Sequence, residues 1–209
     1  MTYGDRIPDR AVTRLSLVLR RLEVLCAAGV KRVFSRELAE KVGVTAVQVR
    51  RDLMAIGYSG SPNKGYEVCA LSQAIKAWLH PGLRPAAALV GLGNLGRALL
   101  TYFRDREPHL DLLAAFDIDP GKTCMECVGL AVHHVDELER VCKALNVRVA
   151  ILTLPPEAAQ AVAERLAAVG VHALVNFTHA SLRLDPHVFV EDVDLSVALD
   201  RAVFFSHKK

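Results

Sequence analysis

The sequence has no long hydrophobic run, and this absence excludes one class of protein. No apolar stretch approaches the roughly 18 residues that a membrane-spanning helix needs, although hydrophobic residues make up 52% of the chain. The first residues also lack the apolar core of a signal peptide. We therefore expect a cytoplasmic protein without membrane contact. Its 209 residues suffice for one large or two small domains.

Cysteines are few and odd in number. Five are spread along the chain, unlike the even, regularly spaced set of a secreted disulfide framework, so we expect them to be reduced. Cys124 and Cys127 form a CxxC pair, which leaves a metal or a reversible disulfide as alternatives to a structural role. His133 and His134 do not follow at the spacing of a zinc finger, so no metal site is predicted.

The small net charge of +3 conceals an asymmetry between the two parts of the chain. Residues 1–80 hold 13 Lys and Arg against 7 Asp and Glu, a balance of +6, whereas residues 81–209 hold 13 against 16, a balance of −3. A basic N-terminal module with an anionic partner is indicated. Residues 81–85, with two prolines and a glycine, predict a short, stiff linker between the modules.

The basic module has the pattern of a helix-turn-helix. Apolar residues at helical spacing predict helices over Pro8–Ala28, from a Ser35 cap to Val42, and from a Thr45 cap to about Ile56. A glycine-rich loop and then Tyr66–Leu71 follow, which we interpret as a wing, and a further helix is predicted over residues 71–79. In this layout the second short helix enters the major groove of DNA. The alternative is a small helical packing module whose arginines are merely solvated.

The second module begins with a glycine-rich turn. Five apolar residues, Ala86–Val90, predict a buried strand, and Gly91, Gly93 and Gly96 follow in G-x-G-x-x-G spacing before a helix. In a dinucleotide-binding fold the first glycine permits the tight turn, the second lets the backbone approach a pyrophosphate, and the third lets the helix lie close to its strand. The loop Gly91-Leu92-Gly93-Asn94-Leu95-Gly96 is therefore the candidate phosphate site. Within it, Asn94 either meets a phosphate or accepts a left-handed backbone.

An acidic residue stands where the motif needs one for a ribose hydroxyl. Asp117 ends the next apolar run and is better spaced than Asp119, and no basic residue follows before Lys122, which favours NAD over NADP. A purely structural glycine turn or a site for another nucleotide is the alternative.

Strands and helices then alternate to about residue 177, which predicts a parallel sheet with helices on both faces. Because ligands bind at the carboxyl ends of such strands, Thr153, Pro155, Asn176 and Phe177 are candidate neighbours of the nicotinamide. Ordinary loop chemistry would place the same residues there. The fold class predicted is α/β: a winged helix-turn-helix domain followed by a Rossmann domain.

Taken together, these stretches resemble the Rex family of redox-sensing bacterial repressors. The resemblance rests on Thr13–Leu15, Leu19–Glu23, Thr45–Leu53, Gly65–Val68, Val90–Leu99, Phe116–Pro120, Asn176-Phe177 and Val193–Leu195. It covers nearly the whole chain. The family's wing usually carries basic residues, whereas this wing has only Lys64.

The resemblance implies a homodimer that binds double-stranded operator DNA, with NADH releasing the DNA and NAD⁺ permitting binding. It implies a winged-helix domain over residues 1–80, a Rossmann domain over 86–191, and a C-terminal helix over 192–209 that swaps into the partner. The candidate DNA contacts are Thr45, Gln48, Arg50, Arg51 and Lys64. Gln48 either caps its helix or reads an adenine edge. By position, Arg20, Tyr102 and Asp194 match a network thought to couple the nucleotide to domain orientation.

Two other functions remain as alternatives. An NAD-dependent oxidoreductase would need a substrate domain and catalytic residues, but only about thirty residues follow the Rossmann core and no Tyr-x-x-x-Lys pair is present. We therefore do not expect an enzyme. A DNA-binding protein with a merely structural glycine loop is the third possibility.

Overall fold

The structure is a computed structural model that describes residues 9–61, 64–82, 84–106, 109–123 and 126–207. The chain divides into two compact units at residues 83 and 84. Each unit has its own hydrophobic core. We describe them separately.

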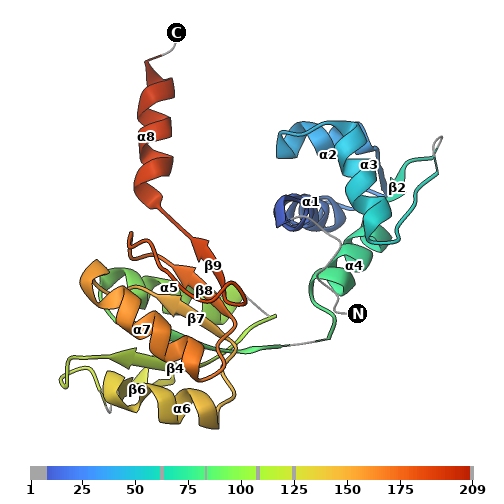
Figure 1. The fold of residues 1–209 in the computed structure, drawn as a ribbon. Helices are drawn as coiled ribbons and strands as arrows, with labels where there is room; N and C mark the ends of the chain where they lie inside the picture. The colour runs from blue at the N-terminus through green and yellow to red at the C-terminus, as the bar shows by residue number, and fades with distance from the viewer. Residues whose placement is uncertain (1–8, 62–63, 83, 107–108, 124–125, 208–209) are drawn as a thin grey trace. The chain divides into compact units, whose positions relative to one another are not determined.

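The N-terminal unit is a helical bundle with a small two-stranded ribbon (Figure 1). Its elements are α1 (Asp9–Ala27), β1 (Arg32–Val33), α2 (Ser35–Val42), α3 (Ala46–Ala55), β2 (Tyr66–Glu67) and α4 (Val68–Leu79). Helix α1 packs against α2, α3 and α4, because its buried residues Leu15, Leu19 and Leu22 recur along one face. β1 pairs antiparallel with β2. The three predicted helices are present, and β2 follows α3 at the place of the predicted wing.

The structure changes two local predictions in this unit. Of the residues Tyr66–Leu71 that we interpreted as part of a wing, only Tyr66 and Glu67 form a strand, and α4 begins at Val68 rather than at residue 71. Val68, Leu71 and Ile75 are fully buried at helical spacing, so helix packing decides the conformation. Ser35 is the first residue of α2 rather than its cap, since the cap is Phe34, whose N–H is bound by Glu37 at 2.7 Å.

The prediction that the cysteines are reduced was also wrong for one pair. Cys26, in the last turn of α1, is joined to Cys69, in the first turn of α4, by a disulfide with a Cα–Cα distance of 5.6 Å. The bond closes a loop with a sequence separation of 43. The sequence spacing of Cys26 and Cys69 does not predict this disulfide, because the packing of α1 on α4 brings the two residues together. Cys124 of the CxxC pair lies outside the described residues, and Cys127 is half-buried.

The C-terminal unit is a doubly wound α/β sheet. The strands are β3 (Ala86–Val90), β4 (Asp111–Asp117), β5 (Glu126–Cys127), β6 (Leu130–His134), β7 (Val149–Leu152), β8 (Ala173–Asn176) and β9 (Phe189–Asp192). Their order is β5-β6-β4-β3-β7-β8-β9, and all neighbours run parallel except β5 and β6. The predicted parallel sheet of the α/β class is confirmed. The edge strand β9 was not foreseen.

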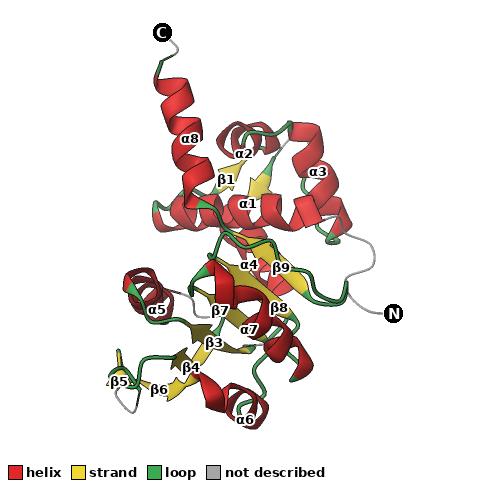
Figure 2. Cartoon of the chain, turned by 60° about the vertical axis from the view of Figure 1, so that its left-hand side comes forward, coloured by secondary structure: helices red, strands yellow, loops and turns green. Residues whose placement is uncertain are grey.

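Helices cover both faces of this sheet (Figure 2). Leu100 of α5 (Asn94–Arg106) belongs to the core on one face, with Leu89 and Ile151. On the other face, α6 (Leu138–Ala144), which follows the short 3-10 helix η1 (Val135–Glu137), and α7 (Pro156–Ala168) cover Phe116 and Leu152. The last helix, α8 (Leu195–Ser206), follows β9. The predicted start near residue 192 falls inside β9, because Asp192 pairs with Asn176 on β8.

Candidate nucleotide and DNA sites

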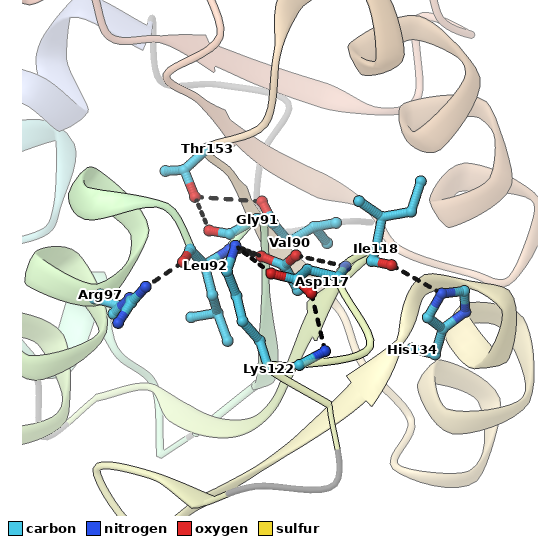
Figure 3. A network of polar contacts seen from close by, with 11 residues as sticks. Val90, Gly91, Leu92, Arg97, Asp117, Ile118, Lys122, His134 and Thr153 are labelled. Atoms are coloured by element: carbon cyan, nitrogen blue, oxygen red, sulfur yellow. Dashed lines mark hydrogen bonds and ion pairs between the residues drawn. The ribbon is translucent and has the colours of Figure 1, made fainter.

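The turn from β3 into α5, of which Figure 3 labels Gly91 and Leu92, belongs to a motif whose three glycines have different surroundings. Gly91 has a φ of +101°, and a Cβ there would lie 2.6 Å from the Thr153 carbonyl oxygen. A Cβ on Gly96 would overlap the Gly91 carbonyl oxygen. A Cβ on Gly93, by contrast, would meet no atom within 4 Å. Gly91 and Gly96 are therefore required by the turn and by helix packing, whereas Gly93 leaves open space at the N-terminus of α5, where backbone N–H groups favour an anion.

Asp117, at the end of β4, supports this loop from within. It is 6% exposed, and its carboxylate accepts the Leu92 N–H at 2.7 Å and the Asp119 N–H at 2.9 Å. Lys122 Nζ lies 3.1 Å from the same carboxylate. Burial alone would raise the pKa of Asp117, but the two N–H groups and the lysine outweigh it and hold that pKa below its ordinary value. The side chain is thus a charged anchor for the glycine loop.

A more exposed acid lies beside it. The Asp119 side chain is 52% exposed and borders a cavity of about 450 Å³ that Leu92 and Lys122 also line. Lys122 Nζ lies between the two carboxylates, 3.9 Å from Asp119. The cavity therefore offers an exposed carboxylate next to the glycine loop. One oxygen of this carboxylate accepts the Gly121 N–H at 2.9 Å, and the nearby Lys122 is paired more closely with Asp117.

Thr153 and Pro155 follow β7 on the other side of the loop. Thr153 Oγ1 donates a hydrogen bond of 2.7 Å to the Gly91 carbonyl oxygen, so this side chain braces the turn. Pro155 is exposed and caps α7. Both lie at the strand end where the sequence placed them. Thr153 uses its hydroxyl for the loop.

Asn176, at the end of β8, is committed to the connection with β9. Its amide nitrogen donates to the Ala180 carbonyl oxygen at 2.8 Å and to Asp192 Oδ1 at 2.7 Å. Its amide oxygen accepts from the N–H and the hydroxyl of Thr178. Phe177 is half-buried and packs against the core that includes Leu92. Asn176 therefore fixes the corner of the chain that leads into α8.

The same corner contains a polar contact between His179 and Asp194, the residue that caps α8. Asp194 caps α8 by accepting the N–H groups of Ser196 and Val197, and its other oxygen lies 3.3 Å from His179 Nδ1. The bond from the Ser196 N–H and the pairing with His179 lower the pKa of Asp194. His179 and Asp194 also line a cavity of about 210 Å³.

Helix α8 itself exposes an apolar surface. None of its residues is buried. Large hydrophobic side chains are exposed at more than half of their area along its length: Leu195, Val197, Leu199, Val203, Phe204 and Phe205. Such a surface needs a covering partner in water.

In the N-terminal unit, α3 is held by contacts that the sequence did not reveal. Arg14 on α1 donates two bonds, of 2.6 and 2.8 Å, to the carboxylate of Asp52. Asp52 is 6% exposed and also accepts the Gln48 side-chain amide at 2.9 Å. Thr45 Oγ1 accepts the Gln48 N–H at 3.1 Å and so caps α3. The Gln48 amide consequently serves Asp52 and does not close a capping box with Thr45.

The basic residues of α3 and the ribbon lie on the surface. Arg50 and Arg51 are exposed, and Arg50 Nη1 donates to the Ser35 hydroxyl on α2 at 3.0 Å. Lys64 is exposed, and its carbonyl oxygen accepts a bond from Arg32 at 2.9 Å. All three basic residues are thus exposed in the helix-turn-helix unit.

Comparison with known proteins finds family models that match each unit and relatives that match nearly the whole chain. Residues 6–53 match the family model described as "Putative DNA-binding protein N-terminus", and residues 85–180 match that of the CoA binding domain. The redox-sensing transcriptional repressor Rex of Anoxybacillus flavithermus is 38% identical, over 96% of this chain and 94% of its own length. That of Rhodopirellula baltica is 40% identical, over 96% and 86%.

The chain belongs to the Rex family. The family resemblance seen in the sequence is thereby confirmed. Solved Rex structures agree: RSP, a Rex-family repressor, superposes with a TM-score of 0.91 at 31% identity, covering 98% of this chain and 97% of its own. RSP has also been solved with NADH, and with NAD⁺ and operator DNA. The latter matches with a TM-score of 0.88 at 32% identity over 97% and 93%.

The three residues that the family resemblance assigns to coupling between the two sites have different environments. Arg20 is exposed on α1, in the N-terminal unit. Tyr102 is 45% exposed on α5 and makes an edge-to-face contact with Phe103. Asp194 is paired with His179, as described above.

No helix of the described chain is both long and apolar enough to cross a membrane.

Sequence reasoning missed four supporting residues. Asp52 was visible only as the polar residue on the buried side of α3, and its partner Arg14 lies 38 positions away. In the sequence, Lys122 was noted only as the first basic residue after Asp117. The turn after β4 places its ammonium group 3.1 Å from the Asp117 carboxylate. His179 follows Asn176 closely, but only the fold of the β9 corner brings it to Asp194.

Proposed function

We propose that this Rex protein is a repressor that binds operator DNA as a homodimer and is released from it by NADH. One observation carries the proposal: a helix-turn-helix unit and a glycine-loop α/β unit occur in one chain that matches RSP, known with both nucleotide and operator, over nearly its whole length. Acting on DNA, it would work in the cytoplasm. NAD⁺ would permit DNA binding.

For the nucleotide, the residues present fit a dinucleotide. The pyrophosphate would lie over Gly93 against the first N–H groups of α5, with Asn94 and Leu95 at the same helix end. Because Asp117 already satisfies three donors, we assign the ribose hydroxyls to Asp119 and the anchoring of the loop to Asp117. Lys122 is paired with carboxylates, which favours a free 2′-hydroxyl and thus NAD(H).

The nicotinamide end would lie near Thr153, Pro155 and Phe177, at the carboxyl ends of β7 and β8. NADH differs from NAD⁺ by a hydride at the nicotinamide ring, so this end must read the redox state. For the switch to work, the two forms must differ in affinity for the two dimer arrangements, since equal affinities would shift nothing. Asn176 would transmit the difference through its bonds to the β9 corner.

For DNA, α3 would enter the major groove. Arg50 and Arg51 would contact bases or phosphates, with Thr45 and Gln48 at the start of the helix and Lys64 on the wing. The dimer would form through α8, whose exposed apolar side chains a second copy would cover. Arg20, Tyr102 and Asp194 would exchange partners between the two arrangements.

A titration with the two coenzymes tests the proposal. A palindromic duplex, selected from a randomised pool by the protein itself, is bound in NAD⁺ and then titrated with NADH while fluorescence anisotropy is followed. Release at micromolar NADH is expected. Gly93→Val should keep DNA binding and lose the release, because its side chain occupies the space for the pyrophosphate. Equal DNA affinity at every NADH to NAD⁺ ratio would refute the proposal, and turnover of alcohols or hydroxy acids would instead favour an oxidoreductase.

A further inference from the structure

The Cys26–Cys69 disulfide stands at the base of the DNA-binding ribbon. Cys26 lies in the last turn of α1, shortly before β1, and Cys69 lies two residues after β2. The Val68 N–H donates to the Lys31 carbonyl oxygen at 3.0 Å, so the two chain segments are already paired beside the sulfurs. The closed loop contains α2, α3 and the ribbon, and with them every candidate DNA contact. The bond therefore ties together both ends of the DNA-binding segment.

The disulfide is open to reagents. Cys69 is exposed and Cys26 is half-buried. Both line a cavity of about 410 Å³ together with Lys31, Arg32 and Glu67. A small oxidant or a reducing thiol can therefore reach the sulfur atoms. Cys142 gives the contrast within the same chain: it is 1% exposed in the core of the α/β unit, and burial raises its pKa to about 11.

The two cysteines are not equivalent in charge environment. Cys69 occupies the first turn of α4, where the positive end of the helix dipole stabilises a thiolate. Two cations, Lys31 and Arg32, line the same cavity against one carboxylate, Glu67. Cys26 lies at the opposite, negative end of α1. Cys69 is therefore the attacking thiolate, and Cys26 is the thiol that resolves the intermediate.

We propose that Cys26 and Cys69 form a reversible thiol oxidation site, with a hydroperoxide as oxidant, that strengthens operator binding in its disulfide form. This proposal rests on the proposed repressor function. A protein that acts on DNA works in a compartment where thiols are kept reduced, so an accessible disulfide there is transient. The disulfide holds the ribbon and the recognition helix together in the free protein. In the reduced protein more of this ordering has to occur on DNA binding, and its entropic cost lowers the affinity for DNA.

The chemistry balances with the hydroperoxide alone. The Cys69 thiolate attacks the peroxide oxygen, so that an S–O bond forms, the O–O bond breaks and an alcohol leaves with one proton. The Cys26 thiol then attacks the resulting sulfenic acid sulfur; the S–S bond forms, the S–O bond breaks, and water leaves with the thiol proton. Two thiols and one hydroperoxide thus give one disulfide, one alcohol and one water. A dithiol reductant reverses the step by thiol–disulfide exchange.

The test uses the full chain in two redox states. Protein reduced with dithiothreitol is divided, and one part is treated with hydrogen peroxide; peptide mass spectrometry after alkylation identifies the Cys26–Cys69 cross-link. Both parts are titrated onto the selected duplex in NAD⁺. We expect the oxidised form to bind roughly three- to tenfold more tightly, the effect of one or two side chains ordered in advance. Dithiothreitol should reverse the gain.

Variants separate this site from the other thiols. Cys69→Ser and Cys26→Ser should bind like reduced protein before and after peroxide, whereas Cys127→Ser, the matched control, should respond like the wild type. If either serine variant fails to fold, the two states of the wild type still decide. A cross-link that never forms, equal affinities, or tighter binding by the reduced form overturns the proposal, as does loss of the response in Cys127→Ser. NADH release is measured in the same samples: if it persists, only this inference fails, and if it too is absent, the repressor function fails.

Discussion

Two glycines of the same G-x-G-x-x-G motif should respond differently to the same substitution. Gly96→Ala places a methyl group on the Gly91 carbonyl oxygen, a backbone atom that cannot rotate away. Gly93→Ala places the same group where no atom lies within 4 Å, and Gly93 does not have the positive φ that Gly91 has. We therefore expect Gly96→Ala to destabilise the α/β unit and Gly93→Ala to leave its stability nearly unchanged.

The magnitude follows from three contributions. Moving α5 away from β3 to relieve the overlap costs about 1–3 kcal/mol, as in other overpacked cores. Displacing Gly91 weakens the bond of 2.7 Å that it accepts from Thr153, worth about 1 kcal/mol. Alanine is preferred over glycine within a helix by about 1 kcal/mol, which offsets part of this cost because Gly96 lies in α5. A net loss of about 1–3 kcal/mol results for Gly96→Ala, against less than about 1 kcal/mol for Gly93→Ala.

Urea unfolding of the full-length variants, followed by circular dichroism, measures both numbers. Quenching of NADH fluorescence, recorded on the folded proteins, reports the site separately. Equal unfolding midpoints for Gly96→Ala and the wild type would show that α5 does not depend on close contact with the turn. A Gly93→Ala protein as unstable as Gly96→Ala would show that position 93 is enclosed, contrary to the geometry.

Three further predictions concern other parts of the chain. Asp52→Ala should lower the free energy of unfolding by about 2–3 kcal/mol in urea titrations, because it leaves the half-buried Arg14 without its carboxylate; an unchanged midpoint would exclude that pair as a stabilising contact. Arg51→Ala should weaken operator binding by about 1–3 kcal/mol if Arg51 reads a guanine and by less if it meets phosphate, and unchanged affinity in anisotropy titrations would argue against α3 as the recognition helix. Arg165 lowers the pKa of Glu139 from 4.5 to about 2, so this pair stabilises the fold above pH 4.5 and its contribution disappears as the pH falls toward 2. Since the Glu139 side chain is 39% exposed, this contribution is below about 1 kcal/mol. In urea titrations at several pH values, the free energy of unfolding of Glu139→Gln should therefore fall by that much less than the wild type's between pH 4.5 and 2.

Much of this fold could be predicted because its main elements are encoded locally. The strand Ala86–Val90 was predicted with the bounds that the structure gives it, since five apolar residues end at a glycine that must turn. Helix α1 follows from the period of its leucines. The edge strand β9 could not be seen in the same way. Its residues are largely exposed, and only pairing with β8 makes them a strand.

The polar residues predicted for the nucleotide site lie at the ends of the strands, but the contacts that each of them makes could not be predicted from their spacing. Asp117 has the position of a ribose-binding acid, yet it is buried among donors. Asp119, two residues later, remains exposed at the cavity. Because β4 ends at Asp117, Asp119 lies in the turn that follows, and this turn decides where both Asp119 and Lys122 lie. Both depend on three-dimensional contacts that a spacing rule does not contain.

The polar side chains at the strand ends suggest how a small ligand can act on a large surface. Asp117 and Thr153 both brace the glycine loop, and Asn176 braces the corner before α8, so none of the three is held by the ligand alone. A nucleotide that shifts this loop or the corner must therefore break or rearrange bonds that are already made. Asn176 is bonded to Asp192, which lies two residues before Asp194, the cap of α8. The apolar side chains of α8 are largely exposed. A change of a few tenths of an ångström at the crevice would thus act on the start of the helix proposed to join the two copies, which is where a difference between NADH and NAD⁺ has to be felt.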